Sequence, residues 1–208
     1  VDNPNARRIN KKPMPTIGGL AIFVAFNIGE FVLLRKDFPT HELFSVLLAS
    51  SVIILTGLID DILELKPRQK MFGIFVASLV VYFLAGIKVR ELSLPFLGHI
   101  QLGWWSFPFT IFWILALTNA VNLIDGLDGL ATGVTLISLV TMGIVGFFFL
   151  KSWQHYVPIM CIMLAACLLG FLPYNFHPAK IFLGDTGALY IGFMISVLSL
   201  KGLKNVTF

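Results

Sequence analysis

The sequence predicts an all-α polytopic membrane protein with about seven transmembrane helices, and three observations support this class. Hydrophobic residues make up 57% of the 208-residue chain, and charged residues only 12%. The mean hydropathy is +0.89. Apolar runs recur from end to end, and most approach the roughly 20 residues that a helix needs to cross a bilayer. We therefore treat residues 1–208 as a single transmembrane domain built on seven apolar runs: 18–34, 43–59, 71–87, 107–121, 130–150, 157–173 and 187–200.

Polar segments separate the first three runs. The first run follows an N-terminal stretch rich in Arg and Lys, which has no feature of a cleavable signal peptide. The second run ends at the acid pair Asp60 and Asp61, and the third begins after Arg68 and Lys70. Charged residues thus mark the boundary between these two helices.

The segment after the third run differs in pattern. Residues 88–103 alternate apolar and polar side chains around the sequence "PFLG", which predicts a small β-hairpin. Trp104 and Trp105 follow directly, and tryptophan is typical of the membrane–water interface. We expect this hairpin to lie at a membrane surface.

The last four runs include the most unusual polar segment. The fourth and fifth runs flank "NAVNLIDGLDGLATG" (119–133), where two Asn and two Asp interrupt apolar sequence. The sixth run contains Cys161 and Cys167, which lie on different faces of a helix and so indicate neither a disulfide nor a metal site. The seventh run, the shortest, follows "HPAKIFLGD" (177–185).

Alternation of seven spans brings the acidic segments to one membrane face. Seven of the eleven Asp and Glu residues fall on that side, and the hairpin falls on the other. Lys and Arg divide almost evenly, so the positive-inside rule orients the protein only through the basic N-terminal cluster of residues 7–12. This cluster favours a multi-pass protein of the cell membrane with its acids on the cytoplasmic face and its hairpin on the extracytoplasmic face.

The converging acids predict a metal and phosphate site. Asn119, Asn122 and Asp125 follow one side of a helix, because residues three apart differ by roughly 60° around its axis. Clustered carboxylates repel one another unless a cation balances them. Oxygen donors without Cys or His favour Mg²⁺ or Mn²⁺, and Mg²⁺ with few protein ligands often binds substrate phosphates. Nearby cations, including Lys70 and Lys180, suit a diphosphate.

Each of these features also has a structural interpretation when taken alone. An acid pair after an apolar helix can be a solvated loop start, and the glycines of "GDTGALYIG" can be helix-packing positions. Phe182 and Lys180 can be an interfacial aromatic and a snorkelling lysine, and His177 a loop residue. The basic excess fits contact with anionic lipid better than with nucleic acid. Acids in a membrane protein are costly to retain, so their combination on one face favours function.

Four segments together resemble a known family. "PTIGGLAIF" (15–23), "GLIDD" (57–61), "NAVNLIDGLDGLATG" (119–133) and "HPAKIFLGDTGALYIG" (177–192) resemble, in order, the polyprenyl-phosphate N-acetylhexosamine-1-phosphate transferases of the glycosyltransferase 4 type. The resemblance extends over nearly the whole chain. It implies a membrane enzyme that joins a sugar 1-phosphate from a UDP-sugar to a polyprenyl phosphate and releases UMP, with Mg²⁺ as the cofactor.

The resemblance implies roles for two groups of acidic and amide side chains. Asp60 and Asp61 match paired catalytic acids beside the transferred phosphate. Asn122 and Asp185 match positions that hold Mg²⁺, for which Mn²⁺ is an alternative.

It also implies roles for residues nearer the phosphates and the base. Asp125 and Asp128 match further catalytic acids of the glycine-rich motif, and Lys70 matches a catalytic basic residue that faces phosphate. Asn175 and Phe182 match the nucleotide site, where an aromatic ring stacks on uracil.

The short segment "DDILELKPRQK" (60–70) is more similar to one branch of the family. That branch uses UDP-N-acetylglucosamine and undecaprenyl phosphate to begin teichoic acid or surface-polysaccharide synthesis. The alternative is the phospho-N-acetylmuramoyl-pentapeptide transferases of peptidoglycan synthesis, which have a longer segment here. The resemblance further implies that this chain lacks a first span, and C-terminal spans with a His-rich cytoplasmic loop. Whether the protein forms a homodimer is left open.

The expected mechanism is a single in-line displacement. A phosphate monoester has its second pKa near 6, so the lipid phosphate is largely dianionic at neutral pH and scarcely needs a general base. Lys70 and the metal offset charge on the pyrophosphate, while Asp60 or Asp61 positions the nucleophile or takes its last proton. The rival is a covalent aspartyl-phosphate route.

Two other functions are less compatible with the residues. In the CDP-alcohol phosphotransferase pattern, an Arg follows the first acids, whereas this chain has Thr132 there and lacks the later Gly and Asp positions. An ion or solute transporter would distribute acids through the membrane depth, whereas here they gather at helix ends.

Overall fold

The computed structural model describes residues 14–34, 40–94, 98–149 and 156–203. These residues form seven helices, a two-stranded sheet and one short 3₁₀ helix at Gly103–Trp105. The helices are α1 (Gly18–Leu34), α2 (Thr40–Leu63), α3 (Pro67–Phe83), α4 (Ser106–Ile124), α5 (Leu130–Phe149), α6 (Tyr156–Asn175) and α7 (Gly184–Leu203). The all-α prediction is confirmed.

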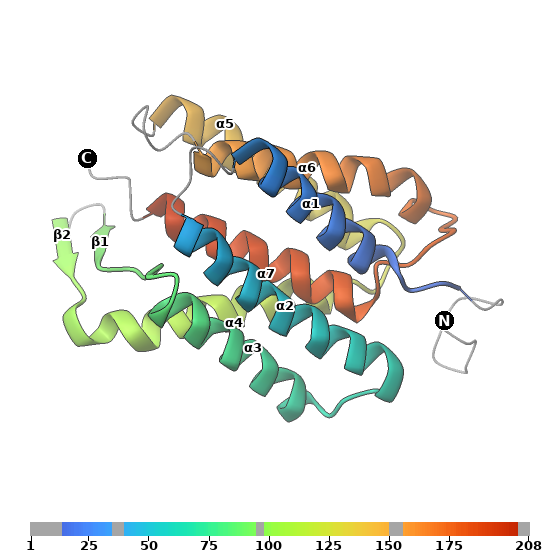
Figure 1. Ribbon diagram of the computed structural model, residues 1–208, viewed down its shortest axis with the longest axis horizontal. Coiled ribbons are helices and arrows are strands. Elements are labelled where there is room, and N and C mark those ends of the chain that lie inside the picture. The colour runs from blue at the N-terminus through green and yellow to red at the C-terminus, as the bar shows by residue number, and fades with distance from the viewer. Residues whose placement is uncertain (1–13, 35–39, 95–97, 150–155, 204–208) are drawn as a thin grey trace.

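The predicted hairpin is also present. Strands β1 (Glu91–Leu94) and β2 (Gly98–Gln101) pair antiparallel, with Glu91 opposite Gln101. The turn residues 95–97 lie outside the described part of the chain. The hairpin lies at one end of the bundle, opposite the end where α2 connects to α3 and α6 to α7 (Figure 1).

Helix α7 is the centre of the bundle. It packs against α4, α2 and α1, and less extensively against α5 and α6, which surround it in Figure 1. Its large side chains Tyr190 and Phe193 are completely buried. At its far end, Lys201 forms an ion pair with Glu42 of α2. The seventh predicted run, the shortest by sequence, is therefore the core element.

Two glycines let α1 and α2 approach the start of α7 at backbone distance. A Cβ atom on Gly19 would lie 2.2 Å from the Cα of Gly187, and one on Gly57 would lie 2.4 Å from the Cα of Thr186. A backbone hydrogen bond also joins the N–H of Gly19 to the carbonyl of Leu183 at 3.0 Å. The motifs "PTIGGLAIF", "GLIDD" and "GDTG" therefore meet at one end of the bundle.

The helix boundaries correct the predicted loops. Because α2 continues to Leu63, the acid pair lies in its final helical turn rather than in a loop. Glu64 then adopts a positive φ of 49°, and α3 begins with Pro67 in its first turn, so only three residues connect the two helices. Charged side chains at a helix end can remain hydrogen-bonded or hydrated, so the helix continues past the end of its apolar run.

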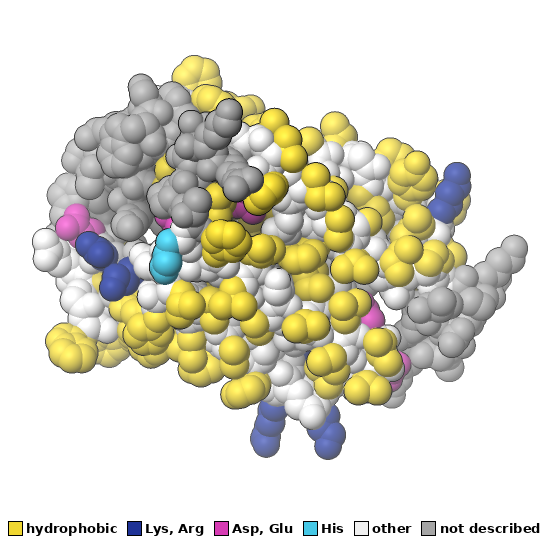
Figure 2. Space-filling view, viewed as in Figure 1, with side chains coloured by type: hydrophobic (Ala, Val, Ile, Leu, Met, Phe, Trp, Pro, Cys, Tyr) yellow, Lys and Arg dark blue, Asp and Glu magenta, His cyan; other side chains and the backbone are white. Residues whose placement is uncertain are grey.

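Within the described part of the chain, four helical segments are long and apolar enough to cross a membrane: His41–Leu63, Gly103–Ile124, Leu130–Phe148 and Tyr156–Asn175. Helix α1 is apolar but shorter. Hydrophobic side chains are spread across the described part of the face shown in Figure 2, and the Lys and Arg side chains visible there lie at its margins. The structure thus supports a multi-pass membrane protein, and the count of seven spans stays a prediction.

Substituting Gly57 tests the close packing of α2 on α7. Gly57→Ala places a methyl group against the backbone of Thr186, and such overpacking costs about 1–3 kcal/mol. Gly170→Ala is the matched control, because its Cβ meets nothing within 4 Å and it gains about 0.5–1 kcal/mol of helix propensity. Thermal unfolding in detergent should show a lower melting temperature for Gly57→Ala only. Equal melting temperatures would contradict this packing.

Candidate active site

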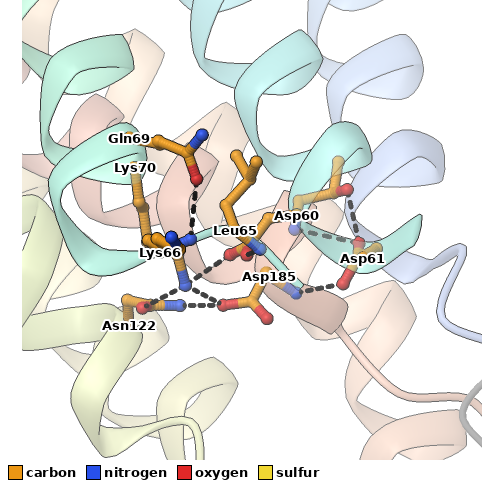
Figure 3. A network of polar contacts seen from close by, with 9 residues as sticks. Asp60, Asp61, Leu65, Lys66, Gln69, Lys70, Asn122 and Asp185 are labelled. Carbon is orange, nitrogen blue, oxygen red and sulfur yellow. Dashed lines mark hydrogen bonds and ion pairs between the residues drawn. The ribbon is translucent and has the colours of Figure 1, made fainter. Parts of the chain in front are cut away.

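Four helix ends bring polar side chains together at one end of the bundle. The last turn of α2 supplies Asp60 and Asp61, and the first turn of α3 supplies Lys70. Asn122 lies near the end of α4, and Asp185 in the first turn of α7. Figure 3 shows these five side chains converging, as the sequence predicted.

The ammonium of Lys70 is the centre of this cluster. It donates to Oδ1 of Asp185 at 2.7 Å and to Oδ1 of Asn122 at 3.3 Å, and forms an ion pair with Asp60. The amide of Asn122 also donates to Oδ1 of Asp185 at 2.7 Å (Figure 3). One cation thus offsets the two carboxylates, which would otherwise repel each other.

Asp60 also ends its own helix. Its Oδ1 accepts a hydrogen bond from the backbone N–H of Leu65 at 2.9 Å, and the residue is only 5% exposed. Gln69 secures the start of α3 by accepting from the backbone N–H of Lys66 at 3.0 Å. The three-residue connection is therefore fixed from both sides, which places Lys70 against Asp60.

Asp61 faces α7 and caps its first turn. Its Oδ1 accepts from the N–H of Asp185 at 2.8 Å, and its Oδ2 from the N–H and hydroxyl of Thr186 at 3.1 and 2.5 Å. Such bonds satisfy the free amides of a helix N-terminus. Gly184 permits this approach, because it has a φ of 74° and a Cβ there would lie 2.9 Å from Asp61. Asp61 therefore positions Asp185.

Asp128 and Asn175 organise the neighbouring loop between α6 and α7. Asp128 contacts Nδ1 of His177 at 3.0 Å and accepts from the N–H of Ala179 at 3.1 Å. Asn175, only 3% exposed, accepts from Thr132 at 2.8 Å and donates to the carbonyl of Ile181 at 3.1 Å. These contacts hold the loop in place, and they lie outside the cluster around Lys70.

Phe182 lies in the same loop, immediately before α7. Its backbone N–H donates to the carbonyl of Pro15 at 2.9 Å, and its carbonyl accepts from Gly18 at 3.3 Å. These bonds tie the loop to the segment that starts α1. The side chain is partly exposed, so its ring is accessible at this end of the bundle.

The sequence analysis did not identify three residues that hold the site in place: Thr132, Thr186 and Gln69. Each fixes a predicted site residue or its helix: Thr132 holds Asn175, Thr186 holds Asp61, and Gln69 caps the helix of Lys70. Thr132 and Thr186 lie within the motifs quoted from the sequence, and this position was the signal that could have identified them. Their hydrogen-bond partners are 43 and 125 residues away in sequence.

The donor set suits a hard divalent cation. Oxygen atoms of Asp60, Asn122 and Asp185 converge on Lys70, and Mg²⁺ is commonly bound by one or two carboxylates, with waters and phosphate completing its shell. No three His, Cys, Asp or Glu side chains form a metal-binding group within the described residues. A metal here would therefore depend on Asn122 and on substrate oxygens as well as on carboxylates.

Asp125 follows α4 at the edge of this cluster. Burial, with the negative charges of Asp185 and Asp61, raises its pKa from 3.8 to about 7. Between these two values the folded protein keeps a proton that the unfolded chain releases. Its free energy of unfolding therefore falls as pH rises through that window, and levels off above it.

Replacing Asp125 should remove this pH-dependent fall in the free energy of unfolding. In EDTA, Asp125→Asn should melt at a higher temperature than the parent protein at pH 8. The difference should shrink by pH 5, where the folded carboxyl is already neutral. Thermal unfolding in detergent across this range measures both. A difference that is the same at every pH would contradict the raised pKa.

The sequence is similar to those of known proteins. The sequence model of glycosyl transferase family 4 matches residues 43–203, which include most of α2 and every helix from α3 to α7. A probable undecaprenyl-phosphate N-acetylglucosaminyl 1-phosphate transferase of Bacillus subtilis is 41% identical over 100% of this chain and 57% of its own length.

Two phospho-N-acetylmuramoyl-pentapeptide-transferases are somewhat less similar. The protein from Clostridium botulinum (strain Eklund 17B / Type B) is 36% identical over 96% of this chain and 63% of its own length. The protein from Clostridium novyi is 36% identical over 91% of this chain and 61% of its own length. The chain thus spans about three-fifths of the length of these relatives. Because the family match covers most of the sequence, the chain belongs to glycosyl transferase family 4.

Proposed function

We propose that the protein transfers N-acetylglucosamine 1-phosphate from UDP-N-acetylglucosamine to undecaprenyl phosphate and releases UMP. The observation that carries this proposal is the cluster around Lys70, where a cation, two carboxylates and an amide meet at one end of an apolar bundle. A soluble nucleotide and a lipid phosphate can both reach such a place. The reaction would begin cell-wall, teichoic acid or surface-polysaccharide synthesis.

We also propose a membrane arrangement. We infer that all seven helices cross the cell membrane, with α7 shielded inside the bundle and therefore able to be less apolar. The Lys70 end lies at the cytoplasmic face, where nucleotide sugars are available, and the hairpin lies at the other face. The chain is then the larger part of a transmembrane domain whose further spans lie outside it.

The chain's own residues supply binding and positioning. Lys70 can neutralise charge on the pyrophosphate, and Asp61 holds the first turn of α7 so that Asp185 faces the cluster. Asn122 and Asp185, with Asp60 beside them, would hold Mg²⁺ or Mn²⁺. When bound, that ion would stabilise negative charge on the phosphates.

The reaction we favour is a direct in-line displacement. A lipid phosphate oxygen forms a bond to the β-phosphorus of the UDP-sugar, and the bond from that phosphorus to the UMP oxygen breaks. Both Asp61 oxygens accept hydrogen bonds from α7, which leaves this side chain poorly placed as a covalent nucleophile. Asp60 would position the attacking phosphate or take its last proton. Trapping of a phosphorylated aspartate would overturn this version.

The sugar is proposed from two observations. The Bacillus subtilis relative is 41% identical, against 36% for the two muramoyl-pentapeptide relatives. The connection between α2 and α3 is also short, as in the branch that uses UDP-N-acetylglucosamine. The muramoyl-pentapeptide substrate remains the second candidate.

UMP release in detergent tests the proposal. The full-length protein that contains this chain should release UMP from UDP-N-acetylglucosamine only with Mg²⁺ and undecaprenyl phosphate. Lys70→Met should lower kcat/KM by about 10²–10³-fold, because it removes a preorganised charge at the phosphates. Lys88→Met, which lies near the hairpin over the ring of Tyr82, is the matched control and should retain activity.

Two outcomes would contradict the assignment. Release only from UDP-muramoyl-pentapeptide would move the protein to the second candidate. If the folded, full-length protein released no UMP with either sugar, the transferase proposal would be wrong. Nucleotide-independent ion flux in liposomes would then favour transport.

A further inference from the structure

A polar cavity lies between the hairpin and the start of α4, at the end of the bundle opposite the Lys70 cluster. Its volume is about 420 Å³, which is typical of a small-molecule site. The side chains that line it include Lys88 and Arg90 before β1, Gln101 of β2 and Ser106 at the start of α4. Figure 1 shows the hairpin leading into α4 at this end, away from the candidate active site.

The described side chains around the cavity carry a net positive charge. Lys88 and Arg90 contribute two cations, and Glu91 is the one acid among them. Within the part of the chain that the structure describes, neither cation forms an ion pair with an acidic side chain. The ammonium of Lys88 instead lies 5.0 Å from the centre of the Tyr82 ring. The guanidinium of Arg90 is therefore available to an anion, and its planar fork can bind two phosphate oxygens at once.

A buried hydroxyl borders the same cavity. Ser106 is only 5% exposed, and its Oγ has no hydrogen-bond partner among the described residues. Leaving a buried hydroxyl unpaired is unfavourable, and rotation about its one side-chain torsion can turn it toward a ligand in the cavity that Ser106 lines. Because Ser106 begins α4, that ligand would also lie at the positive end of the helix dipole. Hydroxyl, dipole and guanidinium all favour an anion with oxygen acceptors.

The surroundings of the cavity favour a lipid over a soluble anion. Trp104 and Trp105, which lie between Gly103 and Ser106 on its rim, are 97% and 74% exposed. Tryptophan side chains prefer the depth of the lipid headgroups, so the phosphates of a membrane would lie level with the cavity. Phe83 is also largely exposed and adds apolar surface beside the cavity for acyl chains.

We propose that this cavity binds the headgroup of an anionic phospholipid. Arg90 holds two phosphate oxygens, Ser106 donates its hydroxyl to the phosphate, and Lys88 adds positive charge beside them. One phosphodiester charge balances the net charge of the described lining. The bound lipid ties the hairpin to the start of α4 and takes no part in the reaction, so the inference goes beyond the proposed function. It requires only that the hairpin end lies at a membrane surface.

Melting temperatures with added lipid test the site in the parent protein. The full-length protein that contains this chain would be delipidated in neutral detergent and titrated with phosphatidylglycerol, phosphatidylcholine or inorganic phosphate. A ligand that binds only the folded protein raises its melting temperature. Phosphatidylglycerol should therefore raise it, and the other two should raise it much less. Native mass spectrometry measures the affinity and the number of bound lipids independently of turnover.

Two variants test the residues that hold the phosphate. Arg90→Gln should weaken phosphatidylglycerol binding by about tenfold or more, because it removes a charge-assisted, two-pronged hydrogen bond. Arg68→Gln, which removes the same charge at the start of α3, is the matched control and should bind like the parent. Ser106→Ala should weaken binding by roughly threefold to tenfold. Without lipid it should melt no lower than the parent, because it removes only an unpaired hydroxyl, whereas loss of a structural serine would lower the melting temperature.

Three results would overturn the proposal. One is a phosphatidylglycerol affinity equal to that of the parent in folded Arg90→Gln or in Ser106→Ala. Another, which needs no variant, is equal binding of phosphatidylcholine and phosphatidylglycerol, because a positively charged site must distinguish them. The third is an equal rise in melting temperature with inorganic phosphate, which would identify the ligand as a free phosphate rather than a lipid.

Discussion

The ion pairs of Lys70 with Asp60 and Asp185 are the interaction on which the site depends. Carboxylates from two helices can lie this close at the end of an apolar bundle only if a cation offsets their charge. Lys70 provides that cation from a third helix, and Asn122 adds neutral hydrogen bonds from a fourth. The same charge balance that stabilises the helix ends also creates an anion-binding and cation-binding centre.

Accurate placement of α7 makes this balance possible. Asp61 caps its first turn, and Gly19 and Gly57 bring α1 and α2 against its backbone. Lys201 pairs with Glu42 at the other end, so both ends of the central helix are tied to α2. The geometry of the site thus depends on small residues and helix caps as much as on the residues that would touch substrate.

The sequence predicted the helices and the convergence of the acids well, because both follow from apolar run length and alternation of spans. It ended the second apolar run before Asp60 and Asp61, because such a run ends where charged residues begin, whereas α2 continues to Leu63. Individual side-chain contacts could not be predicted from the sequence. That Asp61 caps α7, and that Asn175 is held by Thr132, depends on tertiary packing across distant segments. Spacing along the chain carries no information on such pairs.

A double-mutant cycle of Lys70→Met and Asp185→Asn tests the central claim most directly. The free energy of unfolding would be measured in detergent for the parent, both single variants and the double variant. If the ion pair organises the site, the double variant should lose less stability than the sum of the single losses, by about 0.5–3 kcal/mol. Strictly additive losses would show that the two side chains do not interact, and would contradict the account.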